Sequence, residues 1–233
     1  MTKKITVLWL CNVPLPEIAC TLGINPPVVG GWLVGLSNGL VRMTDLNLNI
    51  CFFTPQVKAM KHGKTNSMSY YALPQSKKLQ EQILLLKKVL EQVKPNVVHI
   101  FGTEFYTSNA MISACEEFRC IDQTLLSIQG LISVYAKHFS TGIPTYWKYK
   151  LMPRDFYHNT TIHHQQKMFV KNGLFEIDTI KRVKHISGRT DWDRACTYHI
   201  NPRAVYHFCN ETLRNSFYEH QWKVGNCKRH RIF

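Results

Sequence analysis

The sequence predicts an α/β protein built on a doubly wound, mostly parallel sheet of about seven strands. Short apolar runs of strand length alternate with longer stretches that carry apolar residues at helical spacing. Pro95 ends one of these helices and leads into Val97, Val98 and Ile100, a run typical of a buried parallel strand. Because we find neither an internal repeat nor a low-complexity linker, we expect a single domain.

The same patterns place the elements along the chain. The expected strands cover residues 5–11, 48–54, 67–73, 97–101, 124–128, 183–187 and 204–209. Asn12 and the prolines that follow it end the first strand, and we expect a loop after them. We also expect a turn at 62–66. Helices are expected at 32–40, at 79–93 with Ser76 as the cap, at 108–118, at 167–182 and after Gly188. The expected buried side of the 167–182 helix consists of Met168, Phe169, Leu174, Ile177 and Ile180.

The composition narrows the class of partner and compartment. The net charge of +14 over 233 residues favours an anionic partner, such as nucleic acid, a phosphate-bearing ligand or an acidic membrane surface. The eight cysteines are scattered and form no Cys-x-x-Cys, which favours a reduced protein that uses them as small apolar residues. No signal peptide and no stretch of transmembrane length are found, so we expect a cytoplasmic location.

The segment from Tyr135 to Gln166 has a different character from the rest of the chain. It mixes aromatic residues with lysines and histidines and has poor periodicity. It is either a solvated, partly helical excursion or a surface for lipid headgroups, where amphipathic aromatics and cations collect. His158, His163 and His164 lie here, but no further ligand type stands at a recognised spacing, so we expect no metal.

Polar residues that directly follow strands are candidate ligand contacts, because open α/β sheets bind ligands outside the carboxyl ends of their strands. These residues are His99, Thr103, Glu104, Gln129, Arg189, Thr190 and Asp191. Each has a structural alternative: a hydrogen-bonded strand residue for His99, a helix cap for Thr103 or Thr190, a first-turn acid for Glu104, and a mutual ion pair for Arg189 and Asp191. Gly30 and Gly31 precede a helix and could offer backbone N–H groups to an anion, or form a plain turn.

Four short stretches carry a resemblance to a known family. They are 101–104 (Phe-Gly-Thr-Glu), 127–130 (Ser-Ile-Gln-Gly), 188–193 (Gly-Arg-Thr-Asp-Trp-Asp) and 210–214 (Asn-Glu-Thr-Leu-Arg). With Gly30-Gly31 before the first long helix, the chain resembles the Rossmann-like N-terminal domain of GT-B fold glycosyltransferases of family four, of the bacterial capsule and lipopolysaccharide type. The resemblance covers the whole chain.

The resemblance implies transfer of a sugar from a nucleotide-diphosphate sugar, with retention at the anomeric carbon and no metal or other cofactor. It implies that residues 1–209 form the acceptor-side domain, for a glycan or lipid-linked acceptor. Residues 210–233, with Asn210, Glu211 and Arg214, would be the crossover and the truncated start of a missing C-terminal domain. Gly30 and Gly31 would lie near the donor phosphates and the acceptor. The basic charge suits the inner face of an anionic membrane.

Two departures from the family pattern affect the expected chemistry. Many members carry a histidine where this chain has Phe101, so the polar role passes to Glu104 or His99, or is absent. The donor-gripping carboxylates of the second domain have no counterpart, so we expect no appreciable turnover from this chain alone. The alternative is a basic nucleic-acid-binding or other ligand-binding Rossmann-like module. No nucleic-acid-binding motif is present and the basic residues are dispersed, which disfavours nucleic acid.

Overall fold

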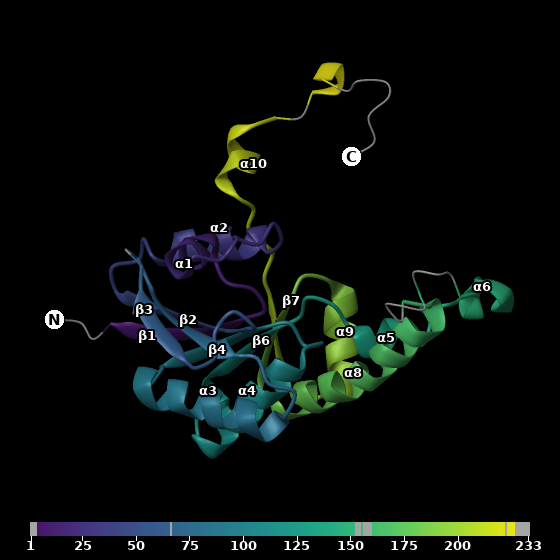
Figure 1. The fold of residues 1–233 in the computed structure, drawn as a ribbon, viewed down its shortest axis with the longest axis horizontal. Coiled ribbons are helices and arrows are strands. Elements are labelled where there is room, and N and C mark those ends of the chain that lie inside the picture. The colour runs from purple at the N-terminus through teal and green to yellow at the C-terminus, as the bar shows by residue number, and fades with distance from the viewer. Residues whose placement is uncertain (1–3, 66, 152–154, 156–159, 222, 227–233) are drawn as a thin grey trace.

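Eight strands form one sheet in the computed structural model, which describes residues 4–65, 67–151, 155, 160–221 and 223–226 (Figure 1). The order across the sheet is β3-β4-β2-β1-β5-β6-β7-β8. All neighbouring strands are parallel except β3 and β4, which are antiparallel. The strands are β1 (Ile5–Cys11), β2 (Leu46–Thr54), β3 (Lys61–Lys64), β4 (Ser69–Pro74), β5 (Val97–Phe101), β6 (Thr124–Ser127), β7 (His185–Gly188) and β8 (Val205–Phe208).

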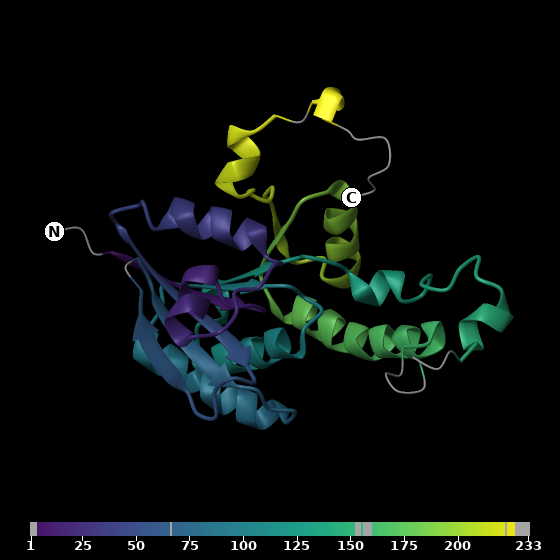
Figure 2. The ribbon, with the colours of Figure 1, turned by 45° about the horizontal axis from the view of Figure 1, so that its top comes forward.

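Helices lie on both faces of this sheet, as Figures 1 and 2 show, and the predicted doubly wound α/β class is confirmed. One face carries α1 (Pro16–Leu22) and α2 (Gly31–Leu40), and the other carries α3 (Leu79–Val93), α4 (Tyr106–Glu117) and α8 (Ile162–Arg182). The remaining helices are α5 (Ile132–Tyr135), α6 (Thr145–Tyr149), α9 (Asp191–Ile200), α10 (Asn215–Glu219) and two short 3-10 turns at Ile121–Gln123 and Val224–Asn226.

The alternation of side chains along the central strands builds two cores. Leu8, Leu10 and Ile100 pack on the α3–α4–α8 side, whereas Trp9 and Phe101 pack on the α1–α2 side. This is the period of two that a strand imposes on its side chains. The strand order reverses between β1 and β5, so the loops after these strands diverge and leave room at their carboxyl ends.

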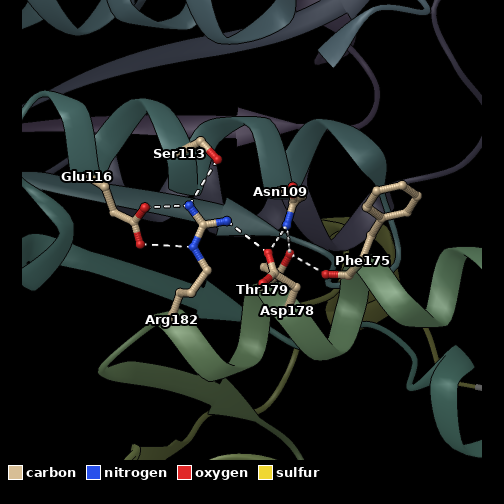
Figure 3. Close-up of polar contacts among 7 residues, drawn as sticks. All are labelled: Asn109, Ser113, Glu116, Phe175, Asp178, Thr179 and Arg182. Carbon is tan, nitrogen blue, oxygen red and sulfur yellow. Dashed lines mark hydrogen bonds and ion pairs between the residues drawn. The ribbon is translucent and has the colours of Figure 1, made fainter. Parts of the chain in front are cut away.

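A polar network fixes α8 against α4 (Figure 3). Arg182 of α8 donates to both carboxylate oxygens of Glu116, at 2.9 and 2.5 Å, and its Nη1 donates to Asp178 at 2.9 Å. The Asn109 amide of α4 also donates to Asp178, at 2.7 Å. The bidentate geometry holds the two helices at one register, because a guanidinium matches a carboxylate in only a few orientations.

Two expectations for the first third of the chain are wrong. The expected turn at 62–66 contains strand β3, which makes the eighth strand, although Asn66 itself lies outside the described residues. Its sequence Lys-His-Gly-Lys has little strand propensity, but the exposed lysines suit a sheet edge, and a Cβ at Gly63 would lie 2.5 Å from Tyr70 Cζ. The expected loop after β1 contains α1, with Pro16 in its first turn and Gly23 in the left-handed conformation at its end.

Two helix expectations also need correction. Ser76 is not the N-cap of α3; that residue is Lys78, and the Ser76 hydroxyl instead contacts the Lys78 N–H and the Glu81 carboxylate. Helix α8 begins at Ile162 rather than 167, capped by the Thr161 hydroxyl. Its buried residues are Gly173, Glu176, Thr179 and Ile180, whereas Met168 and Leu174 are exposed. The apolar pattern misplaced this face because two of its buried side chains are polar and satisfied by hydrogen bonds. The last residues of the expected C-terminal segment, 227–233, lie outside the described residues.

Candidate functional site

A cavity of about 290 Å³ lies on the α2 face of the sheet, over β5 to β8. The sheet contributes His99 and Phe101 from β5, Leu125 and Ser127 from β6, and His207 from β8. Trp32 and Leu36 of α2 form one wall, and the segment 209–212 forms another. The ends of β6 and β7 complete it, with Gly188 of β7 and the following residues Ile128, Gln129 and Arg189. The cavity is therefore a mainly apolar hollow with polar groups at the carboxyl ends of the strands, the usual composition of a ligand site.

His99 and Ser127 form the polar part of the cavity wall on the sheet. The His99 Nε2 and the Ser127 hydroxyl lie 2.6 Å apart, on neighbouring strands β5 and β6. Burial lowers the pKa of His99 to about 3, so its ring is neutral at physiological pH. The ring also packs against Phe101, with centroids 3.9 Å apart. His99 is therefore a hydrogen-bonded strand residue, one of its two interpretations from sequence, and a neutral polar group in the cavity wall.

Aromatic rings line the wall beside His99. Phe101 contacts Trp32 at a centroid distance of 5.1 Å and Trp9 at 4.9 Å. Phe101 is nearly fully buried, whereas Trp32 is half-buried and borders the cavity. Trp32 and Phe101 thus form a pair of packed aromatic rings in the cavity wall.

Arg189 joins three strand ends at the rim of the cavity. Its Nη1 lies 2.5 Å from Glu211 Oε1, and its Nη2 donates to the Gln129 carbonyl at 2.8 Å. The Gln129 side chain in turn accepts from the Asn12 amide at 3.2 Å. Both members of the ion pair are about one-third exposed, so a ligand can reach them. The loops after β1, β6 and β7 therefore meet the segment after β8 at one polar rim.

Gly30 caps α2 and Gly31 begins it, and the Arg214 side chain already covers Gly31. Gly30 has φ 79°, which favours glycine, and a Cβ on Gly31 would lie 2.8 Å from Arg214 Nε. The Arg214 guanidinium donates to the Val28 carbonyl at 2.8 Å, and Thr212 donates to the Trp32 carbonyl at 2.9 Å. The segment after β8 is thereby held along the start of α2, and it brings the Arg214 guanidinium to the N-terminus of that helix.

The loop after β5 carries the carboxylate of Glu104 and contacts the buried carboxylate of Glu176 on α8. Gly102 has φ 94°, and a Cβ there would lie 2.7 Å from the Phe105 ring, so the sharp turn requires glycine. Thr103 is fully buried, and its hydroxyl lies 2.7 Å from the Glu176 carboxylate and 2.9 Å from the Gly130 carbonyl, two acceptors that compete for its single proton. Its hydroxyl is therefore committed to the protein interior, and it acts as a link between loops.

Glu104, in contrast, keeps an unused acceptor. Its Oε2 is buried and makes no hydrogen bond within the part of the chain that the structure describes. Burial raises the pKa of Glu104 to about 7, and the nearby Glu176 adds to this while Arg189 opposes it. A carboxyl group that titrates near neutrality can accept or donate a proton, which suits general acid–base work. Glu104 does not border the cavity directly.

Thr190 and Asp191 serve the start of α9. The Thr190 hydroxyl accepts from the Asp193 N–H, and the Asp193 carboxylate accepts from the Arg189 and Thr190 N–H groups, forming a capping box. The Asp191 side chain is almost fully exposed and pairs with Arg194 at 3.0 Å. Neither residue borders the cavity, whereas Asn210 and Glu211 do.

Sequence reasoning missed Trp32, Ser127 and His207 as cavity residues. The hollow lies over β5 to β8 on one face of the sheet. Its position depends on where α2 and the segment after β8 pack, which the sequence does not reveal. A second hollow, on the same face, shares Leu125 and His207 and adds His185 and Asp122. The His185 Nδ1 and His207 Nε2 lie 3.1 Å apart. The sequence signal for this hollow was the histidines and small polar residues that occur at alternate positions on β5 to β8. A sheet face that helices cover completely would be expected to carry apolar residues at those positions.

Metal binding and membrane crossing can be examined over the described part of the chain. There, no three His, Cys, Asp or Glu side chains gather in a way that could hold a metal ion. His158, considered above with His163 and His164, lies outside that part. None of the described helices has the length and apolarity needed to cross a bilayer.

The comparisons with known proteins found similar structures but no similar sequences. The sequence matches no protein-family profile and no curated protein. Among solved structures, the UDP-GlcNAc 2-epimerase from Methanocaldococcus jannaschii has a TM-score of 0.48 and 12% identity over 89% of this chain and 45% of its own. The α,α-trehalose-phosphate synthase (UDP-forming) from Burkholderia vietnamiensis has a TM-score of 0.48 and 10% identity over 86% and 43%. The chain thus spans less than half the length of these enzymes.

Proposed function

We propose that this chain is the acceptor-side half of a retaining glycosyltransferase that uses a nucleotide-diphosphate sugar, of the kind that builds bacterial surface glycans such as capsule and lipopolysaccharide. The single observation that carries the proposal is the cavity over β5 to β8. It combines an aromatic wall, neutral hydrogen-bonding groups and an ion pair at the rim. Sugars need this combination, because a pyranose ring has an apolar C–H face for an aromatic ring and hydroxyls around its edge.

The size and charge of the cavity favour an acceptor sugar over the whole donor. About 290 Å³ lies at the lower end of ligand-pocket volumes, which run from about 300 to 1,000 Å³, and this suits a small sugar unit. The neutral His99 and Ser127 offer no charge to a diphosphate. At the rim, Arg189 is paired with Glu211, so its positive charge is partly balanced.

Glu104 is the candidate proton-transfer group in this proposal. Its carboxyl lies near Arg189, and its pKa of about 7 leaves both protonation states populated at neutral pH. The donor would have to be supplied by a second domain, because transfer requires the developing charge to be stabilised between two lobes. The isolated chain is therefore expected to bind an acceptor but to show no appreciable turnover.

Binding calorimetry with the full 233-residue chain tests the proposal. Titrants are monosaccharides, short oligosaccharides, a short-chain polyprenyl phosphosugar, and UDP- and GDP-sugars. We expect a saccharide-bearing acceptor to bind and Trp32→Ala to weaken it by about tenfold, equivalent to about 1.4 kcal/mol of lost contact. The matched control is Trp192→Ala, since Trp192 is exposed on α9 and does not border the cavity.

Three outcomes would contradict the proposal. Saccharide binding that responds equally to the Trp32 and Trp192 substitutions would place the site elsewhere. A panel in which no saccharide binds, but an oligonucleotide binds tightly and in a salt-sensitive way, would favour the nucleic-acid-binding alternative. Robust sugar transfer by the isolated chain would show that the half-enzyme interpretation is wrong.

A further inference from the structure

Helix α6 and the amino-terminal end of α8 extend away from the sheet. In Figures 1 and 2, α6 lies beside the amino-terminal end of α8, well away from the strands. We call this region the α6–α8 tip and define it by residues 146–151 with His163, Lys167, Val170, Lys171 and Leu174. It shares no residue with the cavity described above.

Exposed aromatic rings and lysines are interleaved on the α6 side of the tip. Tyr146, Trp147 and Tyr149 are each more than half exposed. The Lys150 Nζ lies 4.2 Å from the centroid of the Trp147 ring and 5.3 Å from that of Tyr146. Leu151, which follows, is 67% exposed. Large apolar side chains are therefore held at the surface with cations directly beside them, an arrangement that suits a boundary between an apolar and a charged medium.

One stripe of α8 continues this surface. His163, Lys167, Val170, Lys171 and Leu174 recur at helical spacing on the side of α8 opposite its buried residues. Val170 and Leu174 are 52% and 66% exposed. The rings of Tyr149 and His163, with centroids 4.6 Å apart, connect the two elements. The aromatic cluster and the helix stripe are thus joined where Tyr149 meets His163.

The charge of this region is strongly positive. From 137 to 174 the sequence holds Lys137, Lys148, Lys150, Arg154, Lys167 and Lys171 against one acid, Asp155. The Asp155 carboxylate accepts a hydrogen bond from the Thr160 hydroxyl at 2.5 Å. The acids Glu116, Glu117 and Asp178 lie farther along α4 and α8 and pair with Arg182 or Lys87.

We propose that the α6–α8 tip binds an anionic lipid bilayer, with the aromatic and aliphatic side chains at the headgroup level and the lysines on lipid phosphates. Nucleic acid would also attract the lysines, but it offers nothing to exposed aliphatic residues such as Leu151, Val170 and Leu174. An interfacial surface uses both kinds of side chain, because apolar burial and attraction to anionic lipids add together. This inference does not depend on the cavity or on sugar transfer.

Vesicle sedimentation with the full chain tests the inference. Vesicles of phosphatidylcholine alone are compared with vesicles that also contain phosphatidylglycerol. We expect binding to the anionic vesicles only, and loss of binding as salt rises from about 0.1 M to about 1 M, where the Debye length falls from about 10 to 3 Å. The double substitution Lys148→Ala with Lys150→Ala should weaken binding about 25-fold, since each basic residue near such a surface contributes about fivefold.

The matched control is Lys58→Ala with Lys61→Ala, which removes the same charge from exposed lysines at the β3 end of the molecule. It should leave vesicle binding within a few-fold of the parent. Leu174→Ser changes no charge and lies on a long, well-packed helix, so it should not unfold the tip. We expect it to weaken binding by about tenfold, the equivalent of one leucine side chain left in water.

Several results would overturn the inference. Equal binding to neutral and anionic vesicles would remove the electrostatic part, and equal losses from the two lysine pairs would show that net charge alone acts. Unchanged binding in Leu174→Ser would remove the apolar contact. If an oligonucleotide binds through Lys148 and Lys150 while the vesicles do not pellet the chain, the tip is a nucleic-acid surface instead.

Discussion

Replacing Gly173 with alanine should destabilise the protein, even though alanine is the better helix former. Gly173 is buried on α8 where α5 packs against it. A Cβ at this position would lie 2.8 Å from the Ser133 Cα and 3.2 Å from the Ser133 nitrogen. Both are backbone atoms, so they can move only if α5 shifts as a whole. Overpacking of this kind costs about 1–3 kcal/mol, against a helix-propensity gain of about 1 kcal/mol.

Gly39→Ala is the matched control, because Gly39 lies within α2 and nothing would stand within 4 Å of its Cβ. This variant should keep the full propensity gain, about 1 kcal/mol. The two variants should therefore differ by the cost of the clash, about 1–3 kcal/mol. For a chain of this size that corresponds to about 2–12 °C in Tm. Urea denaturation followed by far-UV circular dichroism, with thermal melts, measures the difference.

The comparison has a clear failing result. If Gly173→Ala were as stable as Gly39→Ala, α5 and α8 would not be in the close contact described. That contact positions the buried Glu176 to accept from the Ser133 N–H at 2.8 Å and from Thr103 at 2.7 Å. It therefore also fixes the loops after β5 and β6, which lead into the cavity.

Three further predictions concern single side chains. Burial raises the pKa of Glu104 from 4.5 to about 7, so the folded state retains a proton that the unfolded chain releases. Stability should fall as pH rises from about 4.5 to 7, and Glu104→Gln should abolish that fall in urea titrations; an identical slope in both proteins would contradict the assignment. Burial lowers the pKa of His99 to about 3, so its ring NMR signals should stay fixed between about pH 8 and 5, and a midpoint near 6.5 would count against it. Arg182→Met removes the bidentate pair with Glu116 and should lower the free energy of unfolding by about 1–2 kcal/mol; an unchanged urea midpoint would show that the pair contributes nothing.

The sheet could be predicted from sequence because its central strands are buried on both faces. The runs at 5–11 and 97–101 are nearly continuous in apolar residues, which only a parallel sheet between helix layers explains well. Strand β3 could not be predicted, since its pairing with β4 comes from the edge of the sheet rather than from local propensity. For α1 the signals were present, namely Pro16 at its start and Gly23 at its end.

The site was predictable only in part. Gln129 and Arg189 line the cavity, and both were predicted from the rule that ligands bind beyond the carboxyl ends of strands. Glu211 also lines it, and it was predicted from the family resemblance. Trp32 could not be found this way, because its place in the wall depends on how α2 packs over a distant strand. Glu176 is a fully buried acid in the middle of a helix, and no local pattern distinguishes it from a solvated one. Only the loops that donate to it explain its position.

The central claim is that the hollow over β5 to β8 binds the sugar unit of an acceptor. Amide chemical-shift mapping of the isotope-labelled full chain, titrated with the saccharides that bind in calorimetry, measures this most directly. We expect the largest shifts at Ser127, Gln129, Gly188 and Arg189, with loss of these shifts in Trp32→Ala. Shifts confined to other surfaces, or unchanged shifts in the Trp32 variant, would contradict the claim.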